Sequence, residues 1–298
     1  MYSDIIILAL AVLPVIVLAV YVYRKDQFNK EPFGLLCKAF FLGVLSVIPA
    51  ALIEGVVSSM YGTMGGADLP VFFQGIFTGF VVAGCTEEIC KLIFLRWAVW
   101  KSPHFDEYFD GIVYATFVSL GFAGIENVMY VVSQDSFASS LATGSMRAIL
   151  SVPGHFLFAV VMGYYFALAR FNPEERKSNM FKAFLYPMLL HGTYDSLLMV
   201  PEYFESDLIS GAFFIVFIYF DIKLWKIGMR RLKALQALNE EQYRSSAAND
   251  TNYSDYSDYG NQGGDSGGAG YGDSGSWNND DSSSQSNGDA FGGFKWDV

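Results

Sequence analysis

Two adjacent glutamates and a lysine lie inside a long apolar stretch of this chain, in the segment GCTEEICKLIFLRW at residues 84–97. Glu87, Glu88 and Lys91 are therefore placed where burial makes a charge costly, which marks them as candidates for function. A buried carboxylate near an ammonium can serve as a base that deprotonates water. Adjacent residues point about 100° apart on a helix, so we expect one glutamate to be the base and the other to pair with Lys91.

Two of the three histidines also lie in apolar segments. His155 and His191 could bind a metal ion, orient a water molecule or stabilise an oxyanion. Asp195 follows His191 by four residues, a spacing at which its carboxylate can fix the orientation of the imidazole. The sequence contains no HExxH, GxSxG or glycine-rich phosphate-loop motif. Zn²⁺ held by His155, His191 and Glu87, and a metal-free mechanism that uses the same groups, therefore both stay open.

Long apolar segments must position these side chains. The chain is 52% hydrophobic and only 16% charged, and several of its segments approach the ~20 residues that cross a bilayer. The predicted fold class is all-α, a polytopic bundle of about seven transmembrane helices within residues 1–238. The predicted spans are residues 4–23, 33–57, 71–97, 109–132, 147–169, 181–200 and 208–228.

Basic residues alternate from one side of this predicted bundle to the other. Lysines and arginines follow the first, third, fifth and seventh spans, whereas residues 58–70, 133–146 and 201–207 contain none. The positive-inside rule then places the N-terminus outside and the C-terminus in the cytoplasm. We expect an integral protein of the plasma membrane, with the lipid bilayer as one partner.

The composition changes at about residue 239 to glycine, serine, aspartate, asparagine and tyrosine. Such a segment lacks the aliphatic residues that build a core, so residues 239–298 are predicted to be a disordered acidic tail. Residues 245–298 hold nine aspartates and one lysine, which gives −8 of the formal net charge of −11. No basic patch remains that would bind nucleic acid.

The neighbours of the polar residues indicate which way they face. A small residue lies one helical turn from each polar residue, as Ala83 does from Glu87. Small residues mark helix–helix contacts in membranes. Counting from flanking charges puts Glu87 and His191 near the midplane. The same counting puts His155 and Glu126 about 9–10 Å further out. The sequence thus predicts one polar layer that is elongated along the membrane normal.

The order of these motifs resembles the PrsW family of intramembrane proteases, over about residues 1–230. The resemblance is carried by EExxK at residues 87–91, GFAGIENVMY, HFLFAVVMGYYFALAR and HxxxD at residues 191–195. It implies a polytopic endopeptidase, distantly similar to type II CAAX prenyl endopeptidases, whose glutamate and histidines activate water. Some members cut membrane-bound anti-sigma factors. By resemblance the catalytic or metal-binding residues are Glu87, Glu88, His155 and His191, supported by Lys91, Glu126, Asn127 and Asp195.

Three functions are compatible with the sequence. The leading hypothesis is an intramembrane endopeptidase that hydrolyses a peptide bond of a single-pass or membrane-associated protein. A transporter, channel or scaffold that uses the same buried charges as an ion path is the alternative, although the internal repeat of many transporters is missing. A zinc-dependent lipid amidase ranks last, because that chemistry generally takes more histidines than the two placed in spans.

Overall fold

The computed structural model describes residues 2–204 and 206–260, and within them it contains helices and no strand. The predicted all-α class is confirmed. The chain divides into two units, residues 1–250 and 251–298, and the account below concerns the first. The α-helices are α1 (Tyr2–Lys25), α2 (Phe33–Thr63), α3 (Val71–Phe77), α4 (Thr86–Val99), α5 (Asp110–Val132), α6 (Phe137–Met146), α7 (Val152–Phe171), α8 (Arg176–Met199) and α9 (Asp207–Gly260).

Two π-helical segments join consecutive α-helices without a break. The segment η2 (Thr78–Cys85) connects α3 to α4, and η3 (Arg147–Ser151) connects α6 to α7. Two short 3₁₀ turns, η1 (Gly66–Asp68) and η4 (Val200–Tyr203), lie in the connections before α3 and after α8. The chain therefore forms long continuous helices. Such helices suit a bilayer, because every backbone N–H and C=O group there must form its hydrogen bond within the protein.

Five helical segments of the described chain are long and apolar enough to cross a membrane, namely Ile5–Lys25, Phe33–Thr63, Asp110–Val132, Phe137–Phe171 and Asp207–Ser246. The other two predicted spans correspond to the continuous helical run of residues 71–99 and to α8. These two helices carry Glu87, Glu88 and Lys91, and His191 and Asp195, respectively. The buried polar groups lower the mean hydropathy of these two helices and add charges, so neither is among the five apolar spans. The same residues that suggest function thus weaken the hydropathy signal.

Two boundaries differ from the sequence prediction. Residues 137–146, which were predicted to be loop, form α6 and continue into α7. Ser136 caps this helix by accepting a hydrogen bond from the Ser139 backbone N–H at 3.2 Å. Because the neighbouring residues are polar, the sequence pattern predicts a loop here. Residues 239–260, expected to begin the disordered tail, are helical, while residues 261–298 lie outside the described residues.

Helix α7 forms the core of the first unit. Every residue from Gly154 to Ala169 is buried, and α5 and α8 pack directly against it. A helix that is apolar on all sides must be covered on all sides. The outer helices α1, α2 and α9 instead expose aliphatic side chains such as Leu13, Leu52 and Ile215, as expected for contact with lipid.

Glycines let the functional helices approach closely. A Cβ atom on Gly79 would lie 2.7 Å from the backbone nitrogen of Ser196, and one on Gly84 would lie 3.0 Å from that of Gly192. The glycines before α4 therefore allow η2 to lie against α8 at backbone distance. This contact confirms that the small-residue face of this span faces protein.

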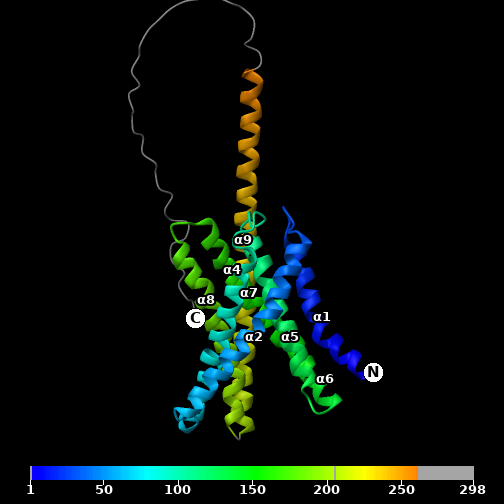
Figure 1. The fold of residues 1–298 in the computed structure, drawn as a ribbon, viewed down its shortest axis with the longest axis vertical. Helices are drawn as coiled ribbons and strands as arrows, with labels where there is room; N and C mark the ends of the chain where they lie inside the picture. The colour runs from blue at the N-terminus through cyan, green and yellow to red at the C-terminus, as the bar shows by residue number, and fades with distance from the viewer. Residues whose placement is uncertain (1, 205, 261–298) are drawn as a thin grey trace, which may run out of the picture. The chain divides into compact units, whose positions relative to one another are not determined.

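The connections that basic residues flank, which we call the basic connections, gather at one end of the first unit. Figure 1 shows the connections at residues 26–32, 100–109 and 172–175 at the upper end of the view, and those at 64–70 and 133–136 at the lower end. Helix α9 binds this upper end through side-chain amides. Gln236 Nε2 donates to the Lys25 carbonyl at 3.0 Å, and Gln242 Nε2 donates to the Asp106 carbonyl at 2.8 Å.

Candidate functional site

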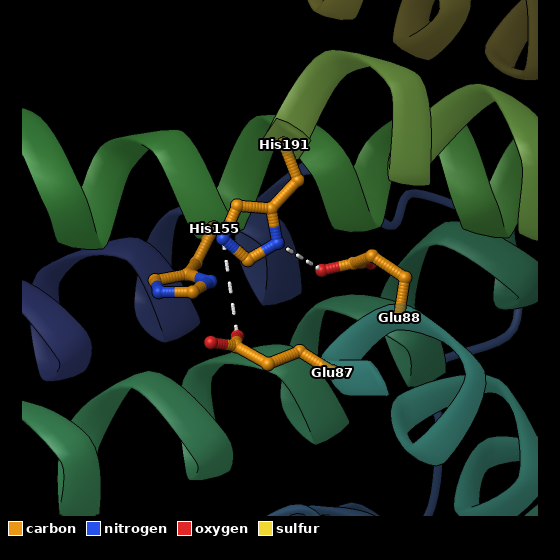
Figure 2. Close-up of side chains that lie close together, drawn as sticks. All are labelled: Glu87, Glu88, His155 and His191. Carbon is orange, nitrogen blue, oxygen red and sulfur yellow. Dashed lines mark hydrogen bonds and ion pairs between the residues drawn. The ribbon is translucent and has the colours of Figure 1, made fainter. Parts of the chain in front are cut away.

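Four polar side chains from three helices meet inside the bundle. Glu87 and Glu88 come from α4, His155 from α7 and His191 from α8, and Figure 2 shows them directed toward one another. One ligand atom from each lies within 4.8 Å of the others, and all four residues are buried. The sequence prediction that these residues share one polar layer agrees with this geometry.

The π-helical segments lie directly before the site on two of the three helices. Helix α4 begins at Thr86 just after η2, and α7 begins at Val152 just after η3 with Pro153 in its first turn. Insertions of this kind re-aim the following side chains and occur often at functional sites. Pro153 has no backbone N–H, and the π-helical segment η3 ends two residues before it.

Lys91 lies at the centre of the cluster. Its Nζ atom is 2.9 Å from Glu87 Oε2, 2.8 Å from Glu88 Oε1 and 3.2 Å from His155 Nδ1. The prediction that only one glutamate pairs with Lys91 is therefore wrong, because spacings of three and four residues both bring the carboxylate onto the lysine side of the helix. The two carboxylates compensate an ammonium that is completely buried.

Each histidine lies between the cluster and a second carboxylate. His155 Nε2 is 3.0 Å from Glu126 Oε2, and its Nδ1 faces Lys91. His191 Nε2 is 3.2 Å from Asp195 Oδ2, and its Nδ1 is 2.9 Å from Glu88 Oε1. Since Lys91 can only donate, His155 must accept at Nδ1 and donate at Nε2. His155 thus directs Nδ1 toward Lys91 and Nε2 toward Glu126. His191 directs Nδ1 toward Glu88, while its Nε2 faces both Asp195 and Glu87 Oε2, the latter at 3.9 Å (Figure 2).

Arg147 extends this network and was not singled out by the sequence. One of its terminal nitrogens lies 3.1 Å from Glu126 Oε2, and its Nε donates to Asn127 Oδ1 at 2.8 Å. Asn127 in turn donates to the Ala11 carbonyl at 2.8 Å and ties the network to α1. The available signal was an arginine within an apolar helical segment. The sequence pattern predicts a loop over residues 133–146, so Arg147 was placed at the end of a loop rather than inside a helix.

The depth prediction is wrong for His155. Its ring centroid lies 5.2 Å from that of His191, whereas residue counting placed it well outside the plane of Glu87. Counting assumes parallel α-helices, but the π-helical segments and the inclination of the helices change the height of each residue. Glu54, left outside the predicted site, also approaches it, since its Oε1 accepts from Thr86 Oγ1 at 3.1 Å.

The donor set fits a metal ion. Two imidazole nitrogens and two carboxylate oxygens are ligands that Zn²⁺ accepts. In addition, both histidines have the outer carboxylate that orients metal-binding imidazoles. Lys91 competes for the same donors, because its ammonium already contacts Glu87, Glu88 and His155. His191 would also lose a proton on binding, since both of its nitrogens now face carboxylates.

Comparison with known proteins agrees with the motifs. The model of the family described as "PrsW family intramembrane metalloprotease" matches residues 31–221. Protease PrsW of Clostridioides difficile (strain 630) is 36% identical over 226 residues, which cover 75% of this chain and 89% of that protein. Protease PrsW of Bacillus subtilis (strain 168) is 33% identical over 237 residues, which cover 79% and 98%. No solved structure matches the chain.

Proposed function

Because the chain belongs to the PrsW family of intramembrane metalloproteases and is an intramembrane protease, we propose that Glu87 is the base that activates water. Two observations support Glu87 over Glu88. The Glu87 side chain is 10% exposed and that of Glu88 only 1%. Glu88 is also held by hydrogen bonds to both Lys91 and His191, so Glu87 is the carboxylate with more freedom to accept a proton.

Zn²⁺ is the metal of this proposal, and its ligands are His155, His191 and Glu88. The sequence paired the histidines with Glu87, but the short contact between Glu88 Oε1 and His191 Nδ1 supports Glu88 instead. When bound, the ion acts as a Lewis acid toward water and the peptide carbonyl. Glu126 and Asp195 would keep each Nε2 protonated, and each Nδ1 would bind the ion in place of its present contact with Lys91 or Glu88.

The chain's own groups then account for the proton transfers. Glu87 takes a proton from water as the water oxygen bonds to the peptide carbonyl carbon. The carbon–nitrogen bond breaks as Glu87 returns that proton to the leaving nitrogen. The Lys91 ammonium, 2.9 Å from Glu87, keeps this carboxylate oriented and is placed to donate to a developing oxyanion.

The substrate of this proposal is a single-pass or membrane-associated protein of the plasma membrane. The site lies among buried helices whose outer neighbours expose aliphatic side chains, which favours a substrate presented from the bilayer. Gathering of the basic connections at one end (Figure 1) supports a cytoplasmic C-terminus and an external N-terminus. That the substrate is an anti-sigma factor is supported by the family resemblance alone.

Metal content and cleavage, measured on the same purified variants, test these roles. Glu87→Gln is expected to keep its zinc and lose about 10³-fold or more in cleavage rate, because the base is gone while the ligands stay. Glu88→Gln, His155→Ala and His191→Ala should lose both zinc and cleavage. The matched control is Glu174→Gln, an exposed carboxylate in a connection, which should change neither. Cleavage at the unmodified rate by Glu87→Gln would refute the assignment of the base.

A further inference from the structure

A second group of acidic side chains lies apart from the intramembrane site. Asp26 follows α1, Glu107 lies in the connection between α4 and α5, and Asp110 is the first residue of α5. One carboxylate oxygen from each lies within 4.8 Å of the others. We call these three residues the loop carboxylate cluster. It lies at the end of the first unit where the basic connections gather.

Asp26, one of the two most buried members of this cluster, lacks hydrogen-bond partners of normal geometry. It is 1% exposed, and neither of its carboxylate oxygens has such a partner among the described residues. Asp110 is fully buried but has partners. Its Oδ2 accepts from the backbone nitrogens of Asp106 and Glu107 at 3.1 and 2.7 Å, and its carboxyl group forms a hydrogen bond with that of Glu31. Buried oxygens without partners, such as those of Asp26, are rare unless a ligand is missing.

Little positive charge lies near the cluster. Glu31 and Asp106 add two further carboxylates, and no lysine or arginine of the described residues forms an ion pair with the cluster. Lys30 is the near cation, but its ammonium donates to the carbonyls of Tyr23 and Asp26 at 2.8 and 3.0 Å.

We propose that Asp26, Glu107 and Asp110 bind a hard divalent cation, Mg²⁺ or Ca²⁺, with Glu31 as a flanking acid. The ligand set consists of carboxylate oxygens without any thiolate or imidazole, and such sets select these two ions. The partly exposed Glu107 provides a route from solvent. A cation would also provide the partner that the buried oxygens of Asp26 lack.

The position of the cluster gives the cation a structural consequence. Its ligands belong to the connection between α1 and α2 and to the connection between α4 and α5. Glu107 also accepts from Asn239 Nδ2 of α9 at 2.6 Å, and Asn239 Oδ1 accepts from the Phe109 backbone nitrogen at 3.3 Å. Since α4 carries Glu87 and α5 carries Glu126, the cation would fix the joint between two helices of the proteolytic site and hold α9 against it.

Thermal unfolding and calorimetric titration of the whole detergent-solubilised chain test this site. The protein is first stripped of metal and then titrated with MgCl₂ and, separately, with CaCl₂. We expect saturable binding by one of the two ions with a rise in unfolding temperature. Asp26→Asn should weaken that binding by at least about tenfold, and Glu174→Gln should bind as the unmodified protein does. His191→Ala should retain the response, which separates this site from the zinc site of the proposed function.

The metal-free proteins provide the second measurement. Without a cation, Asp26→Asn should unfold at the same or a higher temperature than the unmodified chain, because it removes an unpartnered buried charge. This outcome also shows that the variant folds. If neither ion raises the unfolding temperature of the unmodified chain, the carboxylates are neutralised by shared protons and the proposal is wrong. An equal response in Asp26→Asn would place the cation elsewhere and overturn it as well.

Discussion

The intramembrane site and the loop carboxylate cluster both bury acidic side chains, but of the two, within the described residues, only the intramembrane site has acids that form ion pairs with lysine or arginine. Lys91 contacts Glu87 and Glu88 at 2.9 and 2.8 Å, and Arg147 contacts Glu126 at 3.1 Å. Asp26, by contrast, is buried with no hydrogen bond of normal geometry to either carboxylate oxygen within the described chain. Buried carboxylates thus have cationic partners in the intramembrane site, whereas the Asp26 carboxylate has none within the described chain.

This difference separates two ways to tolerate buried acids. An internal counter-ion allows the helices to pack before any ligand arrives, although the ammonium must later compete with the ligand for the same donors. A cluster without a counter-ion must take up protons or a cation from solution to be stable. Removing one charged group should therefore have opposite effects on stability in the two regions.

Lys91→Met should cause the largest loss of stability among single changes at either cluster. It leaves Glu87 and Glu88 buried without their ammonium, which costs about 3–5 kcal/mol of the free energy of unfolding. Asp26→Asn should raise that free energy in chelator, because it removes an uncompensated charge. Denaturant unfolding of both variants in the same detergent measures the two signs.

Lys101→Met, a change of an exposed lysine at the end of α4, is the control for losing a positive charge and should stay within about 0.5 kcal/mol of the unmodified protein. A Lys91→Met protein as stable as the control would show that the intramembrane carboxylates are not held by this lysine. The contrast between the two regions would then disappear.

The sequence contained enough to predict most of the intramembrane site. Acidic and imidazole side chains in apolar segments are costly, so their presence marks function without any structure. The sharing of Lys91 by both glutamates and the role of Arg147 needed coordinates, because they depend on helix inclination and on the π-helical segments. The loop carboxylate cluster could not be predicted, since Asp26 follows one helix, Asp110 begins another, and the two meet only through tertiary packing.

Most of the fold was also predictable from the distribution of apolar residues. Long apolar runs identify helices in a bilayer regardless of their packing. The polar helix α6 and the extension of α9 beyond residue 238 were missed, because their composition resembles loop. Asn239 is nevertheless buried against Phe109 and Glu107, so tertiary contacts, rather than composition, account for the helix at that point.

Glu126→Gln and Asp195→Asn test whether the outer acids of the intramembrane site position the histidines. Each change weakens the hydrogen bond to one Nε2 atom and should reduce zinc affinity by about 10–100-fold, with a parallel loss of cleavage at limiting zinc. Competition with a zinc-binding dye measures the affinity. Saturating zinc should restore most of the cleavage, which a merely structural loss would not allow.

Glu31→Gln is the comparison from the other region. It removes a buried acid near the loop carboxylate cluster and should leave zinc affinity unchanged. If Glu126→Gln and Glu31→Gln both leave zinc affinity unchanged, the outer acids do not position the histidines. If both reduce it equally, the two regions are coupled more strongly than their separate contacts suggest.

The loop region should also show a pH dependence of stability in chelator. The pKa of Asp26 is raised to about 6 and that of Glu31 to about 7, chiefly by burial. A carboxyl group with a raised pKa binds more protons in the folded protein than in the unfolded chain, so the free energy of unfolding falls as pH rises from about 5 to about 7.5. The charged and titratable groups that face these acids are Lys30, Asp106, Glu107, Asp110 and Tyr114.

Denaturant unfolding at pH 5 and pH 7.5, with and without the bound divalent ion, measures this dependence. The difference between the unmodified chain and the double variant Asp26→Asn/Glu31→Gln isolates the contribution of these two acids from that of the intramembrane site. In chelator the unmodified chain should lose more stability at the higher pH than the double variant. With the divalent ion the order should reverse, because the ion binds the ionised carboxylates and protons compete with it at pH 5. Equal pH slopes for the two proteins in chelator would mean that Asp26 and Glu31 keep ordinary pKa values in the folded chain.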